Sequence, residues 1–238
     1  MPLEYGSPVL LDAQLEASAP KLGLGLTADQ RGRLLAYLAL IQKWTQVYNL
    51  TSVRNTSEMF THHLLDCLAV ILPLRAGTGA EGERALRVLD VGSGAGLPGV
   101  VLAILNPAWQ VTCVDTVAKK AMFIRQVAAE LGLPNLHGVH GRVEGRDTFK
   151  TPEFDLITSR AFASLKDFTE LTRHLLARAG QWAAMKANLS EEERQAVPQD
   201  VEMFHVEQLA VPELDAVRCL VWLRPSKDAV AVATEPRQ

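Results

Sequence analysis

Apolar residues recur every three or four positions in the first well-patterned segment of the chain, which begins after Thr27 and runs to about residue 50. This spacing predicts one buried face of an amphipathic helix. Thr27 stands immediately before the segment and suits the N-cap position. The residues on the predicted face are Leu34, Leu38, Ile41, Thr45 and Tyr48.

A second helix is predicted within the stretch 58–74, with Ser57 as its N-cap and its end before Pro73. Residues 75–84 are rich in glycine and charge, and this composition is typical of a linker. Residues 1–26 hold few periodic signals. We therefore predict an N-terminal tail and helical extension over residues 1–84.

Short apolar strands alternate with helical patterns in the second part of the chain, which predicts a parallel sheet with helices on both faces. The strand candidates are 85–91, 109–115, 136–140, 154–160, 181–186, 201–209 and 216–224. The helix candidates are 98–105, 118–132, 164–180 and 190–197. A short loop separates the last two strands, so at least one of them runs antiparallel. The predicted class is α/β, with a main domain over residues 85–224 and a mobile tail over 225–238.

The composition is that of an ordinary globular protein, with 48% hydrophobic and 21% charged residues among 238 and a formal net charge of −3. Three cysteines, Cys67, Cys113 and Cys219, form no CxxC pair, so neither a disulfide framework nor a zinc site is indicated. The N-terminus lacks the pattern of a signal peptide, and no apolar run approaches the length of a membrane span. These observations favour a cytoplasmic protein without metal or membrane partners.

The stretch "RVLDVGSGAGLPG", residues 87–99, places a glycine-rich turn between the first strand and the next helix. Ligands of α/β sheets bind at this edge, and Gly92, Gly94 and Gly96 let the backbone approach a ligand closely. Gly94, Gly96 and Gly99 also form a literal GxGxxG, which leaves a nicotinamide-dependent oxidoreductase as an alternative. No Walker A lysine follows the loop, so an NTPase is not indicated.

Acidic residues follow three successive strands and favour a different ligand. Asp90, beside the loop, would repel a pyrophosphate but attract a sulfonium or amino group. Asp115 ends the second strand, where a carboxylate can accept both hydroxyls of a ribose. Val143 and Glu144 follow the third strand and suit an adenine ring and its amino group. S-adenosylmethionine carries a sulfonium, an amino group, a ribose and an adenine but no phosphate, and it is the predicted cofactor.

The loop after the fourth strand, "TSRAF", contains Arg160 and no residue suited to act as a base. Arginine stays protonated at neutral pH, so a target that needs no deprotonation fits this site. The N7 atom of guanine is such a target, because its lone pair is already exposed. Arg160 also pairs well with phosphate or with a cofactor carboxylate, and a surface salt bridge is the alternative role.

These motifs resemble the bacterial 16S ribosomal RNA guanine-N7 methyltransferases, the RsmG or GidB family, from about Thr27 to Leu223. The matching stretches are "KWTQVYNLTSVR" (43–54), "HLLDC" (63–67), "LDVGSGAGLPG" (89–99), "RVE" (142–144) and "SRAFASL" (159–165). The resemblance implies a Rossmann-like class I methyltransferase fold and a target guanine in the decoding region of 16S ribosomal RNA. The implied partner is the small ribosomal subunit or its assembly intermediate. The implied cofactor residues are Gly92, Leu97, Asp115, Val143, Glu144 and Arg160.

Four further residues are candidates for the substrate cleft: Asn49, His63, Asp66 and Lys186. The resemblance implies that His63 and Asp66 border the cleft, although a structural histidine–carboxylate pair is the simpler interpretation. Asn49 has an equally plausible role as a helix stop. The family often has glycine where Ala187 follows Lys186, and serine where Cys67 stands. A catalytically silent adenosine-ligand or RNA-binding protein is a third alternative, which turnover would distinguish.

Overall fold

The computed structural model describes residues 7–80, 84–145, 148–149, 153–160 and 162–226. Its centre is a seven-stranded sheet in the order β3-β2-β1-β4-β5-β7-β6. The strands are β1 Arg87–Val91, β2 Gln110–Asp115, β3 Leu136–His140, β4 Phe154–Ser159, β5 Leu176–Lys186, β6 Val201–Gln208 and β7 Cys219–Pro225. The first five are parallel, whereas β7 runs antiparallel to both β5 and β6, as the short late connection predicted.

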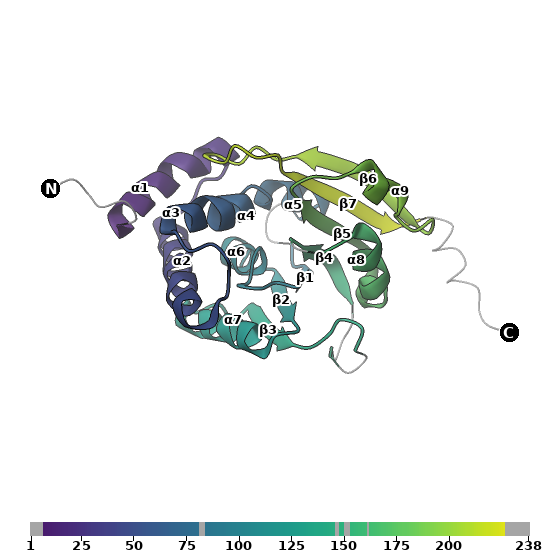
Figure 1. Cartoon of the computed structure of the whole chain (residues 1–238), viewed down its shortest axis with the longest axis horizontal. Helices are drawn as coiled ribbons and strands as arrows, with labels where there is room; N and C mark the ends of the chain where they lie inside the picture. Colours follow the sequence, from purple (N-terminus) through teal and green to yellow (C-terminus); the bar gives the residue numbers. More distant parts are fainter. Residues whose placement is uncertain (1–6, 81–83, 146–147, 150–152, 161, 227–238) are drawn as a thin grey trace.

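Helices cover both faces of this sheet (Figure 1). The helical elements are α1 Pro8–Ser18, η1 Ala19–Leu22, α2 Ala28–Tyr48, α3 Thr56–Met59, η2 Phe60–Leu65, α4 Asp66–Leu68, α5 Ile71–Gly77, α6 Gly99–Leu105, α7 Ala118–Glu130, α8 Leu165–Thr172, η3 Arg173–Leu175 and α9 Glu191–Gln195. Strand residues alternate between two cores: Val88 packs with the core that includes α1, α2, α6 and α7, whereas Leu89 and Val91 pack with the core that includes α8. Asp90 therefore points to the same face as Val88.

The helical extension and the sheet share one hydrophobic core rather than two. Leu15 of α1, Ile41 of α2 and Leu74 of α5 belong to the same buried cluster as Trp222 of β7. At Gly77, a Cβ atom would lie 2.4 Å from the Trp222 ring, so the end of α5 can approach β7 only because this residue has no side chain. The extension is thus one wall of the molecule.

Several helix boundaries differ from those predicted from the sequence. Thr27 caps α2 as expected, through a reciprocal pair of hydrogen bonds with Gln30. The predicted N-cap Ser57 is wrong, because Asn55 accepts from the Ser57 backbone N–H and the helix begins at Thr56. This helical stretch passes Pro73, which occupies the first turn of α5, where the missing N–H is tolerated.

Three other segments depart from the prediction. Residues 75–77, assigned to a linker, complete α5, and the unpredicted helix α1 lies within the segment that held few periodic signals. The helix predicted over 164–180 ends at residue 172, and β5 begins at Leu176, which pairs with Phe154 of β4. Of the tail predicted over 225–238, Pro225 ends β7, and residues 227–238 lie outside the described residues.

The segment Thr56–Gly77 corrects the expectation that no apolar run approaches a membrane span. It is 22 residues long and contains an 18-residue window with a mean hydropathy of 1.2, so by length and composition alone it could cross a membrane. However, 67% of its apolar window is buried inside the fold. Packing of this segment in the protein core therefore accounts for its apolar composition.

Candidate active site

The glycine loop leaves β1 at Gly92 and enters α6 at Gly99. Gly92, Gly94 and Gly96 have φ values of 65°, 58° and 88°, a region that non-glycine residues rarely adopt. A Cβ atom at Gly92 would meet no atom within 4 Å, whereas one at Gly96 would lie 2.5 Å from Val100. Gly92 therefore offers open backbone to a ligand, and Gly96 serves the packing of the loop on α6.

A tyrosine of the helical extension fixes this glycine loop. Tyr37 of α2 is 1% exposed, and its hydroxyl donates a hydrogen bond to the Ala95 carbonyl at 2.7 Å. Burial raises the pKa of the Tyr37 hydroxyl well above its usual value, so the group stays protonated and remains a donor. A residue 58 positions upstream thus fixes the middle of the loop.

Asp90 lies beneath the loop and is fully buried. Its Oδ2 accepts the backbone N–H of Gly99 at 2.9 Å, at the start of α6, while its Oδ1 has no hydrogen-bond partner among the described residues. Burial raises the pKa of the Asp90 carboxyl to about 7, against the opposing effects of the Gly99 bond and the Arg160 charge. Asp90 supports the loop, and its attraction for a ligand cation stays a prediction.

Asp115 lies at the end of β2 and connects the loop to α7. Its Oδ2 accepts the Gly94 backbone N–H at 3.0 Å, and its Oδ1 accepts the Val117 N–H at 2.9 Å. Lys120 approaches Oδ2 at 3.6 Å. Asp115 is only 7% exposed, yet it lines a cavity, so its carboxylate is available from that side.

The cavity measures about 370 Å³, within the usual range for ligand sites, and lies where the parallel strands end. The described residues that line it are Val91, Gly92, Val114, Asp115, Thr116, Val117, Lys120, Gly141, Arg142, Val143, Glu144, Phe162 and Leu171. Four residues predicted to bind the cofactor are therefore brought together here: Gly92, Asp115, Val143 and Glu144. Gly94, Gly96 and Leu97 belong to the loop behind the cavity and do not line it.

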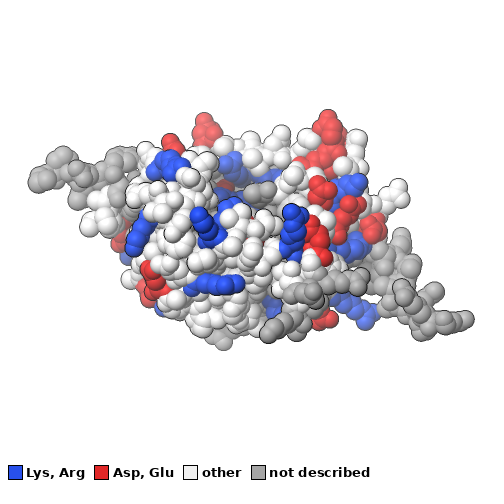
Figure 2. Space-filling view, turned by 60° about the horizontal axis from the view of Figure 1, so that its bottom comes forward, with Lys and Arg blue, Asp and Glu red and all other residues white. Residues whose placement is uncertain are grey.

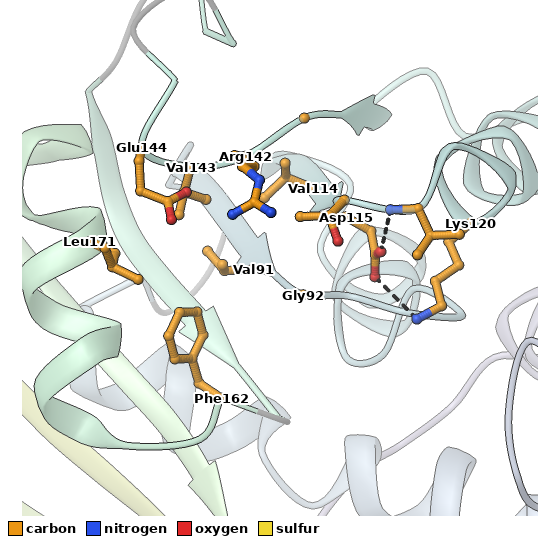
Figure 3. A pocket seen from close by; sticks show the side chains of 13 residues that line it. Val91, Gly92, Val114, Asp115, Lys120, Arg142, Val143, Glu144, Phe162 and Leu171 are labelled. Atoms are coloured by element: carbon orange, nitrogen blue, oxygen red, sulfur yellow. Dashed lines mark hydrogen bonds and ion pairs between the residues drawn. The ribbon is translucent and has the colours of Figure 1, made fainter.

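Figure 3 shows how the side chains divide the cavity. Val143 and Glu144 lie on one side with Phe162 and Leu171 facing them, and Asp115 with Lys120 lies on the other. The Arg142 guanidinium extends between these two groups. One end is thus suited to a flat, partly apolar ring, and the other to hydroxyl groups.

A second polar centre, which we call the Asp66 cluster (His63, Asp66, Arg160 and Arg218), joins the helical extension to β4 and β7. Arg160 Nη1 lies 3.4 Å from Asp66 Oδ2 and donates to the His62 carbonyl at 2.8 Å. Arg218 Nε donates to Asp66 Oδ1 at 3.0 Å. Each carboxylate oxygen of Asp66 therefore contacts one arginine, and the two arginines lie 94 and 152 residues away in the sequence.

His63 lies beside this ion pair network. Its Nε2 is 2.8 Å from Thr51 Oγ1, and its buried Nδ1 has no partner among the described residues. Burial and then the positive charge of Arg160 lower the His63 pKa from 6.5 to about 4. The imidazole is consequently neutral at neutral pH.

Asn49 and Lys186 have local structural partners. Asn49 ends α2 in the left-handed region at φ 51°, and its Oδ1 accepts from Arg54. Lys186 Nζ lies 2.7 Å from Glu193 Oε1 and donates to the Phe162 carbonyl at 3.1 Å. Lys186 therefore supports the loop that contributes Phe162 to the cavity, and its contact with substrate stays a prediction.

Sequence reasoning missed three features of this region. Arg218 gave no local signal, because it stands before an ordinary strand. Phe162 and Leu171 were not expected at the cavity, although Phe162 stands within the quoted "TSRAF" motif.

Among the described residues, no group of three or more His, Cys, Asp or Glu side chains is placed to hold a metal ion.

Comparison with known proteins gives consistent matches along most of the chain. Residues 30–221 match the family model described as rRNA small subunit methyltransferase G. A protein of Paracidovorax citrulli named ribosomal RNA small subunit methyltransferase G is 53% identical over 232 residues, 94% of this chain and 93% of its own length. The protein of that name from Polaromonas naphthalenivorans is 56% identical over 216 residues, 90% of this chain and 96% of its own.

Similarity to solved structures extends to more distant proteins. The crystal structure of ribosomal protein L11 methylase from Lactobacillus delbrueckii subsp. bulgaricus superposes with a TM-score of 0.51 at 17% identity, over 67% of this chain and 77% of that chain. At this identity the match concerns the fold alone. It agrees with the class I methyltransferase fold expected from the sequence.

Proposed function

The chain belongs to the family of rRNA small subunit methyltransferases G, and we propose that it transfers a methyl group from S-adenosylmethionine to N7 of a guanine in the decoding region of 16S ribosomal RNA. The observation that carries the proposal is the cavity that gathers Gly92, Asp115, Val143 and Glu144, with Phe162, two residues after Arg160, in its lining. Family membership decides against the nicotinamide-dependent oxidoreductase, for which GxGxxG was the main argument.

The residues present fit the cofactor. Open backbone at Gly92 and the carboxylate of Asp115 provide a place for a ribose, and the partly apolar end at Val143 and Phe162 provides one for an adenine. S-adenosylmethionine, when bound, supplies an electrophilic methyl group on a positively charged sulfur. Asp115 would accept hydrogen bonds from the ribose hydroxyls, and Glu144 would accept one from the adenine amino group.

The neighbouring groups support a target that needs no deprotonation. Asp66 is held by two arginines, and Arg160 is itself a cation. His63 is neutral, but its Nε2 is engaged with Thr51 and its Nδ1 is buried. Guanine N7 presents a free lone pair, so methyl transfer to it requires alignment and exclusion of water rather than a general base.

Arg160 acts in this proposal as a positioning residue. Its Nη1 is fixed by Asp66 and by the His62 carbonyl, which orients the guanidinium plane. The other N–H groups of Arg160 have no acceptor among the described residues, so they can donate to an RNA phosphate or to the cofactor carboxylate. The small ribosomal subunit or its assembly intermediate is the proposed partner, which places the reaction in the cytoplasm.

The test is transfer of a labelled methyl group into purified small subunits that lack their own modification, followed by N7-specific reduction and strand cleavage. We expect label at a single guanine. Binding of S-adenosylmethionine without label in the small subunit would discard the proposed target. Binding of both the cofactor and RNA without any methyl transfer would identify the catalytically silent binding protein instead.

Arg160→Ala is expected to reduce methyl transfer about a hundredfold, the usual loss when one preorganised donor is removed. Arg173→Ala is the matched control, since Arg173 pairs with Asp200 at 3.0 Å on the surface. Thermal unfolding of both variants shows whether the fold is intact. Near-normal transfer by a folded Arg160→Ala protein would show that this arginine is only structural.

A further inference from the structure

Exposed apolar side chains gather where α2 ends and α7 begins. Of the seven large hydrophobic side chains that are exposed among the described residues, four belong to this place: Val47, Tyr48, Val117 and Met122, at 68%, 44%, 44% and 57% exposure. The two helices are joined there by Trp44, whose ring packs on Phe123 at 5.2 Å. We call Val47, Tyr48, Val117, Met122 and Lys119 the α2–α7 patch.

The patch combines an aromatic ring with a cation. Lys119 Nζ lies 4.9 Å from the centroid of the Tyr48 ring, and Trp44 supports this ring from within the helix at 5.0 Å. Both Lys119 and Tyr48 are exposed. A cation that rests on a solvent-exposed ring is held weakly. Lys119 can therefore leave the Tyr48 ring and pair with a phosphate.

The electrostatic setting favours an anionic partner. Lys119 and Lys120 stand in the first turn of α7, which contains no acidic residue. The positive end of the helix dipole adds to these charges. On the face shown in Figure 2, Lys and Arg side chains spread over the middle, whereas many acidic side chains gather toward one end.

The patch is continuous with the cofactor cavity. Val117 belongs to both, and Lys120 of the same helix turn lines the cavity beside Asp115. On the other side, Asn49 follows Tyr48 directly in the chain. An RNA whose target base meets the cofactor at the mouth of this cavity can therefore extend over the patch with its neighbouring nucleotides.

We propose that the α2–α7 patch binds an unpaired nucleotide next to the target guanine, with its base on the Tyr48 ring and its phosphate on Lys119. Aromatic side chains stack on bases of single-stranded RNA, and nearby cations pair with the backbone. This inference rests on the proposed function, because it assigns to the same RNA substrate a second point of contact. The chemistry excludes paired RNA, whose bases are not available for stacking.

The test uses Tyr48→Leu, which keeps apolar bulk but removes the stacking surface, and Tyr48→Phe, which retains it. We expect Tyr48→Leu to bind a labelled single-stranded RNA 12-mer about tenfold more weakly and to raise the KM for small subunits. Tyr48→Phe should behave as the wild type. The affinity of both variants for S-adenosylmethionine should be unchanged.

Lys119→Ala should flatten the dependence of log Kd on log salt by about one unit, as expected when one phosphate contact is lost. Arg224→Ala is the matched control: Arg224 also lies over an aromatic ring, Phe204 at 4.7 Å, but Glu202 neutralises it through two contacts at 2.9 and 3.0 Å. The salt dependence of this control should equal that of the wild type.

Unchanged RNA affinity and KM in Tyr48→Leu would overturn the inference, even if the wild type methylates the subunit. A loss of affinity for small subunits but not for the RNA 12-mer would also overturn it, because the patch would then contact a ribosomal protein. Absence of methyl transfer by the wild type would refute the proposed function alone, since the RNA binding measurements do not depend on turnover.

Discussion

Asp115 and Asp66 are both buried carboxylates that contact cations, but their surroundings differ. Asp115 accepts two backbone N–H groups and has one lysine 3.6 Å away, five residues along the chain. Asp66 contacts two arginines at 3.4 and 3.0 Å, and both come from distant parts of the sequence. Asp115 lines a cavity, whereas Asp66 fastens the helical extension to β4 and β7.

Asp115 can exchange its lysine partner for a ligand, whereas Asp66 keeps its two arginine partners. The Lys120 contact with Asp115 is long and partly exposed, so a ligand can displace it at little expense in free energy. The two arginines of Asp66 are at most 26% exposed, and removal of the carboxylate would leave both charges without compensation. We therefore expect mutations at Asp66 to affect stability and mutations at Asp115 to affect binding.

Asp66→Ala should give the largest effect, a loss of about 3 kcal/mol in the free energy of unfolding, because two partly buried guanidinium groups would lose their common counter-charge. Urea denaturation measures this loss. Asp12→Ala is the matched control, as Asp12 pairs with Arg31 at 2.9 Å but is 45% exposed, and it should lose less than about 1 kcal/mol. Equal losses in the two variants would contradict the distinction drawn here.

His63 should make the Asp66 cluster sensitive to acid. Its pKa is lowered from 6.5 to about 4 by burial and by Arg160, so the unfolded chain binds more protons between these pH values. Its contribution is fully present above pH 6.5 and is lost as the pH falls toward 4, in total about 3 kcal/mol at 1.36 kcal/mol per pKa unit. His63→Gln should remove this loss.

The measurement is the free energy of unfolding of both proteins across this pH range, and the difference between the two curves isolates His63. Asp90 acts in the opposite direction, because its raised pKa of about 7 makes the folded state bind more protons than the unfolded chain in the same range. Parallel curves for wild type and His63→Gln would show that the histidine does not titrate as its burial implies.

Asp115→Ala should weaken S-adenosylmethionine binding by about 1–3 kcal/mol, the loss expected when bound hydroxyls lose their acceptor. Calorimetry with the purified chain measures the affinity. Lys120→Ala sharpens the comparison: it keeps the Asp115 carboxylate, removes the ion pair at 3.6 Å, and should change the affinity less than threefold, about 0.6 kcal/mol. An Asp115→Ala protein with unchanged affinity would remove Asp115 from the ribose site.

The cofactor side of the molecule was largely predictable, because its residues stand at fixed places in local strand–loop–helix units. The alternation of apolar strands gave the parallel sheet, and residues at the ends of parallel strands necessarily meet at one edge. Gly92, Asp115, Val143 and Glu144 could therefore be placed together without a structure. Their contacts with a cofactor are a prediction that the binding measurements above address.

The Asp66 cluster could be predicted only in part. His63 and Asp66 were expected on one helix, but Arg218 contacts Asp66 across 152 residues, and no local pattern encodes such a pairing. Likewise α1 escaped detection because its apolar residues do not repeat with a clear helical period, and buried Leu11 and Leu15 owe their positions to packing rather than to a strong helical pattern. The contact of Asp90 with the Gly99 backbone N–H was also not predicted, and the expected attraction of Asp90 for a ligand cation stays a prediction.

The contact between Arg218 and Asp66 also bears on synthesis of the chain on the ribosome. Residues of the glycine loop and the cavity up to Leu171 emerge well before β7 (Cys219–Pro225), which Arg218 immediately precedes. A nascent or truncated chain that ends before Arg218 contains all the described residues that line the cofactor cavity but lacks one of the two arginines that hold Asp66. The Asp66 cluster is thus completed only in the last part of translation. In a product cut short before Arg218, the Asp66 carboxylate that holds Arg160 lacks its second arginine.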